Sequence, residues 1–255
     1  MLIEQTLTQL HELKLTGMAD ALEEQRGIPD VQTLPFEDRF ALLLERERTV
    51  RENRRRTRLL RQAKLRLPSA TIEDLNFRDK RGLDRSVVLR LTGCDWIHQH
   101  QVTLITGATG TGKTFLACAL GHAACRHGLS VRYFRLSRLL DELRIARADG
   151  SYTRLLDRLQ RTAALLIDDF GLQALSETER RDLLEVLEDR YGQRATLVAS
   201  QLPIDHWHDI VGDATFGDAI LDRLLHNTHR ITLKGGSMRR VYDSIADPDR
   251  NDSTN

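Results

Sequence analysis

The feature that most constrains this chain is GATGTGKT, residues 107–114, which directly follows an apolar, β-branched run at residues 102–106. It satisfies the pattern G-x-x-x-x-G-K-[S/T] between a strand and a helix, where such a loop cradles phosphate groups. Gly107, Gly110 and Gly112 let the backbone turn tightly and bring its N–H groups against phosphate oxygens. Ordinary residue frequencies give this pattern about a 1 % chance in a chain of this length. The loop therefore predicts a nucleotide site.

The side chains of this loop predict the chemistry of the nucleotide. Lys113 would reach the β- and γ-phosphates, and Thr114 would offer its hydroxyl to Mg²⁺. Ala108, Thr109 and Thr111 complete the loop and would contribute backbone N–H groups. We therefore expect ATP and Mg²⁺ as the ligands of residues 107–114.

A second apolar run, ALLIDDFG at residues 164–171, ends in two adjacent carboxylates. Two acids at the end of a buried strand are costly to place unless a cation or hydrogen-bond donors compensate them. We expect Asp168 to hold Mg²⁺ through water and Asp169 to orient and polarise the attacking water, since phosphoryl transfer depends on positioning and charge stabilisation. The alternative is that the two acids cap the turn that follows.

The pattern of the whole chain predicts an α/β fold with a helical N-terminal region. Apolar runs at 102–106, 131–134, 164–167, 196–200 and 231–233 alternate with helical segments, which is typical of a parallel sheet covered by helices on both faces. Residues 1–67 show helical spacing instead, with a break at Gly27 and Pro29 and a second long segment at 35–67. The expected order is a helical DNA- or partner-binding region (1–67), a connecting segment (68–92), a nucleotide-binding domain (93–245) and a flexible polar tail (246–255).

No run approaches the roughly 18 apolar residues that a membrane helix needs, and the N-terminus lacks the basic-then-apolar order of a signal peptide. We therefore expect a cytoplasmic protein with no membrane partner.

The tract ENRRRTRLLRQAKLR, residues 52–66, concentrates positive charge in a chain whose 38 Lys and Arg nearly balance 37 Asp and Glu. On a helical wheel seven arginines fall within an arc of about 140°, beside an apolar arc, and no acid lies between Asn53 and Arg66. Such a face favours backbone phosphates of duplex DNA over a merely solvated surface, which is the alternative. The seven are Arg48, Arg51, Arg54, Arg55, Arg58, Arg61 and Arg66.

Together, GATGTGKT, LLIDDFG, VASQLPIDHW, ILDRLLHNTHRITLKGGSMR and the N-terminal LHELKLTGMADALEEQ resemble the IstB-like family of insertion-sequence helper ATPases. These are AAA+ proteins related to DnaC-type helicase loaders, and the resemblance covers nearly the whole chain. It implies that residues 93–245 form an AAA+ ATPase domain.

The resemblance also implies roles for residues outside the phosphate loop. Ser200 and Gln201 occupy the position of sensor 1, and which of the two reads the γ-phosphate stays open. Arg223 resembles the arginine finger that inserts into a neighbouring subunit's site, and Arg239 resembles the sensor 2 arginine. Each arginine has the alternative of being an ordinary surface residue.

The implied function is an ATP-dependent, DNA-binding helper of transposition that assembles on duplex target DNA and recruits or stimulates the transposase of the same element. Asp169 stands where AAA+ ATPases commonly have Glu, which favours slow hydrolysis stimulated by DNA or a partner. Only 22 residues follow Leu233, which indicates a minimal or absent lid and a nucleotide enclosed by a neighbour in a ring-shaped or helical homo-oligomer.

Other classes of protein remain as alternatives. A GTPase would need N-K-x-D and an ABC ATPase would need L-S-G-G-Q, and both motifs are absent. A small-molecule P-loop kinase leaves the basic helical region unexplained. The main rival is a replicative helicase loader of the DnaC type. A third reading is a non-hydrolysing, ATP-gated DNA-binding adaptor in which Asp169 is inert.

Overall fold

The computed structural model describes residues 2–77 and 82–238 of the 255-residue chain. The chain divides into two compact units, Met1–Arg58 and Leu59–Asn255. The sequence places the end of the helical region later, at residue 67, and that domain boundary stays a prediction.

The second unit is built on five parallel strands in the order β2-β3-β4-β1-β5. Each strand lies where an apolar run predicts one. Because all five run the same way, the ends of β1 and β3 lie at one edge of the sheet, and these ends carry the phosphate loop and the paired acids. The strands are β1 Val102–Gly107, β2 Val131–Arg135, β3 Ala164–Phe170, β4 Ala195–Ser200 and β5 Thr228–Leu233.

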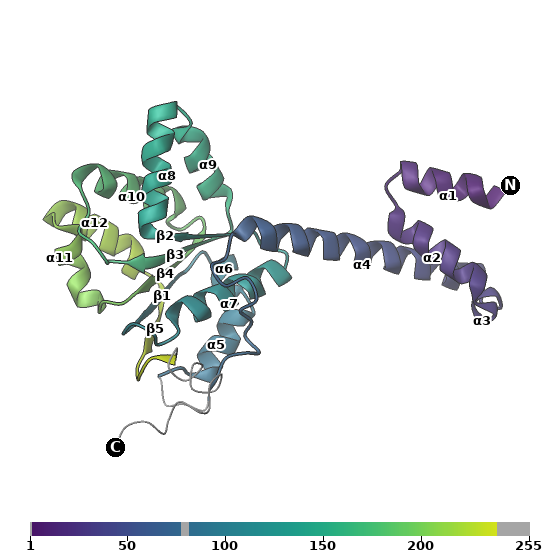
Figure 1. Ribbon diagram of the computed structural model, residues 1–255, viewed down its shortest axis with the longest axis horizontal. Helices are drawn as coiled ribbons and strands as arrows, with labels where there is room; N and C mark the ends of the chain where they lie inside the picture. The colour runs from purple at the N-terminus through teal and green to yellow at the C-terminus, as the bar shows by residue number, and fades with distance from the viewer. Residues whose placement is uncertain (1, 78–81, 239–255) are drawn as a thin grey trace, which may run out of the picture. The chain divides into compact units, whose positions relative to one another are not determined.

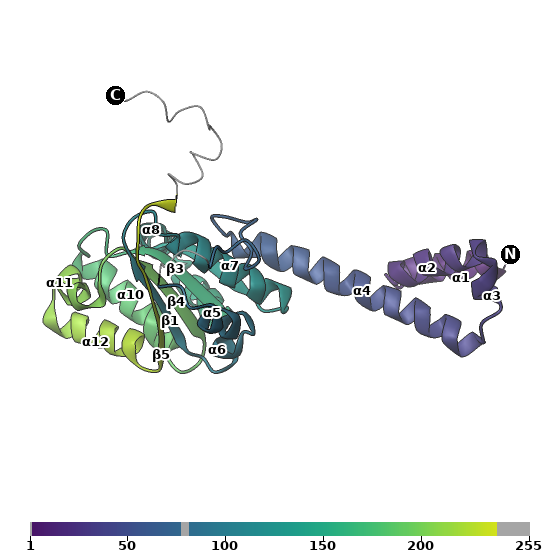
Figure 2. The ribbon, with the colours of Figure 1, turned by 90° about the horizontal axis from the view of Figure 1, so that it is seen from below.

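Helices cover both faces of this sheet (Figures 1 and 2). Side chains alternate between the faces, so that Leu166 joins one buried cluster while Leu165 and Ile167 join the other. On the first face lie α5 Arg85–Thr92, α6 Asp95–His98 and α7 Lys113–Arg126. On the second lie α8 Leu136–Asp149, α9 Tyr152–Arg161, α10 Glu177–Arg190, α11 Trp207–Val211 and α12 Ala214–Leu225, with a 3₁₀ turn at Ile204–His206. The expected parallel sheet with helices on both faces is therefore confirmed.

The first unit consists of helices, two of which, α2 and α4, are joined by a polar contact. Leu15, which precedes α2, makes no side-chain cap, and the buried Glu47 of α4 supplies the missing acceptor. Its Oε2 accepts hydrogen bonds from the backbone N–H groups of Gly17 (2.8 Å) and Met18 (3.2 Å). A Cβ at Gly17 would lie 2.8 Å from the Cα of Glu47, so glycine permits the close approach of α2 to α4. The helices are α1 Leu2–Glu12, α2 Thr16–Gly27, α3 Pro29–Gln32 and α4 Phe36–Ala63, whose last turns belong to the second unit.

The helix α4 ends four residues earlier than the sequence pattern predicts. Lys64 has a φ of 52°, a left-handed conformation that stops the helix, while Leu65 turns into the core. Arg66 therefore does not continue the arginine face of α4, and the helical wheel that included it was wrong at this residue. None of the helices in the described ranges has the length and apolar character needed to cross a bilayer.

Candidate nucleotide site

The phosphate loop depends on glycine at positions where a side chain would collide with the backbone. Gly107 has a φ of 150°, and a Cβ there would lie 2.3 Å from the carbonyl oxygen of Leu233. Gly110 has a φ of 84° and packs as tightly against Ser237. The loop then runs into the N-terminus of α7, whose N–H groups and dipole favour anions. The loop thus has the conformation that a phosphate chain requires.

Lys113 opens α7 and lies under the loop, with only 7 % of its surface exposed. Its Nζ donates hydrogen bonds to the carbonyl oxygens of Gly107 (2.7 Å) and Ala108 (2.9 Å). The ammonium group is therefore held within the loop, where it can meet β- and γ-phosphate oxygens.

A cavity of about 340 Å³ lies over this loop. It is lined by Arg66, Leu67, Thr109, Gly110, Gly112, Lys113, Thr114, Phe115, Asp169, Gln201 and Met238. A smaller and more apolar hollow shares Gly112, Phe115 and Met238 with it and extends toward Leu75 and Leu83. The larger cavity thus carries the two cations Arg66 and Lys113, which suit phosphates, and the adjoining one suits a flat ring.

Asp168 is buried and is the acceptor for three donors. Its Oδ2 accepts hydrogen bonds from the hydroxyls of Thr114 and Tyr133, each at 2.7 Å, and its Oδ1 accepts from the N–H of Asp169 at 2.9 Å. A hydroxyl and a carboxylate in contact are the hard oxygen donors that Mg²⁺ prefers. The donor set of Thr114 and Asp168 therefore fits a magnesium ion. Sequence reasoning missed Tyr133, whose role depends on the pairing of β2 with β3.

Asp169 lies on an irregularity in the sheet. The register between β3 and β4 shifts between Ile167 and Phe170, and Asp169 itself has a φ of 58°. A bulge of this kind re-aims side chains, and here it turns the carboxylate of Asp169 into the cavity. Burial and the neighbouring Asp168 raise the pKa of this carboxyl, while the cations Arg66, Arg135 and Lys113 oppose the shift.

The two sensor 1 candidates differ in their surroundings. Ser200 is fully buried, and its hydroxyl donates to the carbonyl oxygen of Phe170 (2.7 Å) and accepts from the N–H of Leu202 (3.1 Å). Gln201 lines the cavity, and its Oε1 accepts a hydrogen bond from Thr109 of the phosphate loop (2.6 Å). Of the two, Gln201 is therefore the side chain that can meet a bound phosphate.

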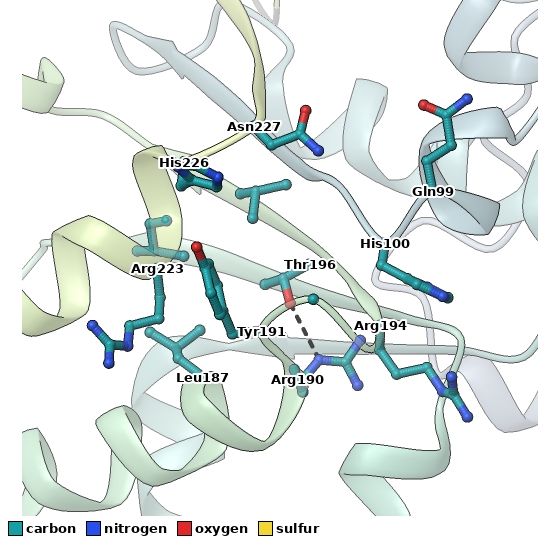
Figure 3. A pocket seen from close by; sticks show the side chains of 13 residues that line it. Gln99, His100, Leu187, Arg190, Tyr191, Arg194, Thr196, Arg223, His226 and Asn227 are labelled. Carbon is teal, nitrogen blue, oxygen red and sulfur yellow. Dashed lines mark hydrogen bonds between the residues drawn. The ribbon is translucent and has the colours of Figure 1, made fainter.

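Arg223 lies at the opposite edge of the sheet from the phosphate loop. It lines a separate cavity of about 220 Å³ together with Val102, the first residue of β1, and Asn227, which precedes β5. Figure 3 shows Arg223, Tyr191 and His226 grouped on one side of this cavity. The Nη2 of Arg223 is 2.6 Å from Glu188 Oε1, and its guanidinium lies 5.9 Å from the Tyr191 ring.

A six-residue strand spans about 20 Å. The structure therefore does not bring Arg223 to the phosphate loop of its own chain.

The predicted DNA-binding arginines fall into three groups. Some make contacts within the first unit: Arg48 pairs with Glu52, Arg51 with Glu47, and Arg54 donates to Thr16. Arg55, Arg58 and Arg61 are exposed along α4. Arg66 instead lines the nucleotide cavity, and its Nη1 is 3.7 Å from Asp169 Oδ2.

Arg239, the sensor 2 candidate, lies outside the described residues. The segment before it packs on the phosphate loop, because the N–H of Met238 donates to the carbonyl oxygen of Gly110 at 2.9 Å.

Comparison with known proteins agrees with this geometry. Residues 8–246 match the family model described as IstB-like ATP binding protein. The chain is 49 % identical over 240 residues to the insertion-sequence ATP-binding protein y4pL of Sinorhizobium fredii, covering 94 % of this chain and 98 % of that one. It is 51 % identical over 203 residues to the ATP-binding protein of insertion sequence IS1162 of Pseudomonas fluorescens, covering 80 % and 88 %.

Solved structures share the fold of the second unit. The DnaC helicase loader matches with a TM-score of 0.53 and 18 % identity, over 65 % of this chain and 97 % of that one. AMPPCP-bound DnaA from Aquifex aeolicus matches with a TM-score of 0.58 and 18 % identity, over 74 % and 57 %. At these identities the likeness shows the fold, a P-loop AAA+ core.

Proposed function

The chain belongs to the IstB-like ATP-binding proteins of insertion sequences, and we propose that it is an ATP-hydrolysing helper that assembles on duplex DNA and serves the transposase of its element. The observation that carries the proposal is the meeting of the Thr114 hydroxyl, Asp168 and Asp169 beside the phosphate loop. A protein that only binds ATP needs the phosphate loop but not two adjacent acids beside it. Hydrolysis can use such acids to hold Mg²⁺ and to orient water.

ATP fits the two adjoining cavities. The triphosphate would lie on residues 107–114 with Lys113 against its β- and γ-phosphates, and the adenine would occupy the apolar hollow lined by Leu75, Leu83 and Phe115. Thr114 and Asp168 would hold Mg²⁺, which would neutralise phosphate charge. Asp169 would orient the attacking water. Because its side chain is one C–C bond shorter than the common Glu, we expect slow turnover, stimulated by DNA or a partner.

The position of Arg223 supports the proposed assembly, if this residue acts as the arginine finger. An arginine about 20 Å from its own phosphate loop can stabilise phosphoryl transfer only in a neighbouring subunit. Such a head-to-tail contact generates rings or helical filaments. In the isolated chain Glu188 neutralises Arg223, so the pair must separate when the neighbour docks.

Duplex DNA would bind along the exposed arginines of α4. Arg55, Arg58 and Arg61 recur every three residues, so they project from one side of the helix and can follow a phosphate backbone. Contacts of this kind read little sequence, which suits a helper that accepts many target sites.

Helicase loading is the second candidate, because the DnaC helicase loader shares the fold. The likeness to insertion-sequence proteins extends over 94 % of the chain at 49 % identity, and this favours transposition. The two functions differ in the protein bound. We expect the chain to co-purify with the transposase of the same element and not with a hexameric replicative helicase, and the reverse result would support loading.

The ATPase assignment is tested by substitutions in the site. Lys113→Ala should abolish binding of ATP with Mg²⁺, because its ammonium is the cation held within the loop. Asp169→Asn should retain ATP binding and lose turnover. Binding is measured by titration and turnover by phosphate release, with and without duplex DNA. Normal ATP affinity in the Lys113 variant would refute the site, and full turnover in the Asp169 variant would refute the role of Asp169 in hydrolysis. A wild type that binds ATP but shows no turnover with or without DNA would support the non-hydrolysing adaptor instead.

A further inference from the structure

Arg66 lines the nucleotide cavity, although it comes only three residues after the end of α4, the helix that carries most of the arginine tract. Its side chain is 44 % exposed, and its Nη1 lies 3.7 Å from Asp169 Oδ2. The cavity that it lines also contains Lys113, Thr114 and Gln201. Neither burial in the core nor a place on the outer face of α4 accounts for this position.

The backbone before Arg66 is held in place by buried neighbours. Ala63 is fully buried and Leu65 is 6 % exposed. Leu65 also packs on α7, since a Cβ at Gly121 of that helix would lie 3.0 Å from its Cδ2. This segment is therefore attached to the helix that begins at Lys113.

The two acids of the site, Asp168 and Asp169, have different partners. Asp168 accepts hydrogen bonds from the hydroxyls of Thr114 and Tyr133 and from the N–H of Asp169. Asp169 lies on the bulge and meets the guanidinium of Arg66. The ammonium of Lys113 is directed to loop carbonyls. Arg66 thus faces the carboxylate that is placed to handle water.

We propose that Arg66 is a positioning residue for ATP hydrolysis, which orients the Asp169 carboxylate from within the same chain and does not contact DNA. This rests on the proposed ATPase function. A carboxylate on a bulge can rotate about two side-chain bonds, and a misplacement of about 1 Å can cost about 10²-fold in rate. A guanidinium anchored beside it limits that rotation.

The test compares Arg66→Gln and Arg66→Lys with Arg126→Gln in the full-length protein. Arg126 is a matched control because it is similarly exposed and also forms one ion pair, with Glu73, at the far end of α7. Turnover is measured without DNA at saturating ATP with Mg²⁺, and ATP affinity by titration. For Arg66→Gln we expect kcat to fall about 10- to 100-fold with ATP affinity within about threefold of wild type. Arg66→Lys should recover most of the loss, and Arg126→Gln should match wild type.

Unchanged kcat in Arg66→Gln would overturn the proposal, as would a loss of ATP affinity in place of kcat, since that would make Arg66 a phosphate-binding residue. If Arg66→Gln fails to fold by circular dichroism, Arg66→Met takes its place and is judged by the same two measurements, kcat and ATP affinity. DNA affinity is also measured at several salt concentrations. A flatter slope of log affinity against log salt in Arg66→Gln, together with normal turnover, would show that Arg66 contacts DNA instead. A wild-type protein without any turnover refutes the ATPase function itself, whereas turnover that needs Asp169 but not Arg66 refutes this inference alone.

Discussion

At the scale of single residues, the site depends on side chains that lie outside its two sequence motifs. The hydroxyl of Tyr133 reaches Asp168 from the neighbouring strand, so the carboxylate is held in a fixed orientation beside Thr114. Hydrogen bonds to a metal-binding carboxylate orient it, and their loss commonly costs about 10- to 100-fold in metal affinity or activity.

Tyr133→Phe should therefore raise the Mg²⁺ concentration needed for half-maximal turnover by about 10-fold, while ATP still binds. A magnesium titration of phosphate release measures this. Tyr152→Phe is the matched control, because its hydroxyl also hydrogen-bonds carboxylates, those of Asp182 and Glu185, away from the cavity. An equal magnesium requirement in the Tyr133 variant and wild type would show that Thr114 and the N–H of Asp169 suffice to orient Asp168.

At the scale of elements, α2 and α4 are joined by a capping contact across 30 residues of sequence. Glu47 of α4 caps the N-terminus of α2 and pairs with Arg51 one turn later, at 2.6 Å. Burial raises the pKa of Glu47, but the hydrogen bonds from Arg51, Met18 and Gly17 outweigh it, so the pKa lies below the ordinary 4.5. The stabilisation is thus complete above about pH 4.5 and is lost as the pH falls through the lower pKa of the folded protein.

Glu47→Gln should destabilise α2 by about 0.5–2 kcal/mol, the usual range for a helix cap. Amide hydrogen exchange of residues 16–27 measures this in the full-length protein, and we expect faster exchange in the variant at pH 7. Protection of wild-type α2 should also weaken at a pH below 4.5. Glu52→Gln is the control, because Glu52 pairs with Arg48 on the exposed surface of the same helix. Equal protection in both variants would contradict the capping role.

At the scale of the whole molecule, the sequence predicts most of the fold and about half of the site. The strands are apolar because both faces of a parallel sheet are buried, and GATGTGKT needs its glycines for local backbone reasons, so both are readable from neighbouring residues. The contacts of Tyr133, Glu47 and Arg66 join residues far apart in sequence. The hydrophobic periodicity of the sequence cannot predict these contacts. The helical wheel placed Arg66 on the long helix because it assumed that the helix continues through residue 66, whereas the left-handed Lys64 ends it at Ala63.

Because Arg223 lies far from the phosphate loop of its own chain, we expect two inactive variants to restore activity when they are mixed in one oligomer. Arg223→Ala and Asp169→Asn subunits should each be inactive alone, because an arginine finger can contribute about 10³ to 10⁵ in rate. Mixed in equal amounts, they should regain activity, since about a quarter of head-to-tail interfaces would pair an intact Arg223 with an intact Asp169. Phosphate release across a series of ratios measures this. Failure to recover in subunits that demonstrably co-assemble would exclude action between neighbours.

The arginines of α4 allow a prediction about DNA affinity, made for three that recur every three residues along the helix. Arg48, Arg51 and Arg54 are engaged by Glu52, Glu47 and Thr16, so they would lose these contacts on binding phosphate. The set chosen for substitution is Arg55, Arg58 and Arg61, which are exposed like the other three.

Replacing this exposed set by alanine should flatten the plot of log affinity against log salt by about 0.9 for each lost phosphate contact per engaged protomer. Affinity for duplex DNA is measured by titration across salt concentrations in the presence of ATP and Mg²⁺. The control replaces three exposed arginines of the second unit, Arg138, Arg144 and Arg181, which removes the same charge. Because it also lowers the net charge by three, the control separates local contacts from a general electrostatic effect. Equal slopes in the two triple variants would show that α4 presents a solvated face and that DNA binds elsewhere.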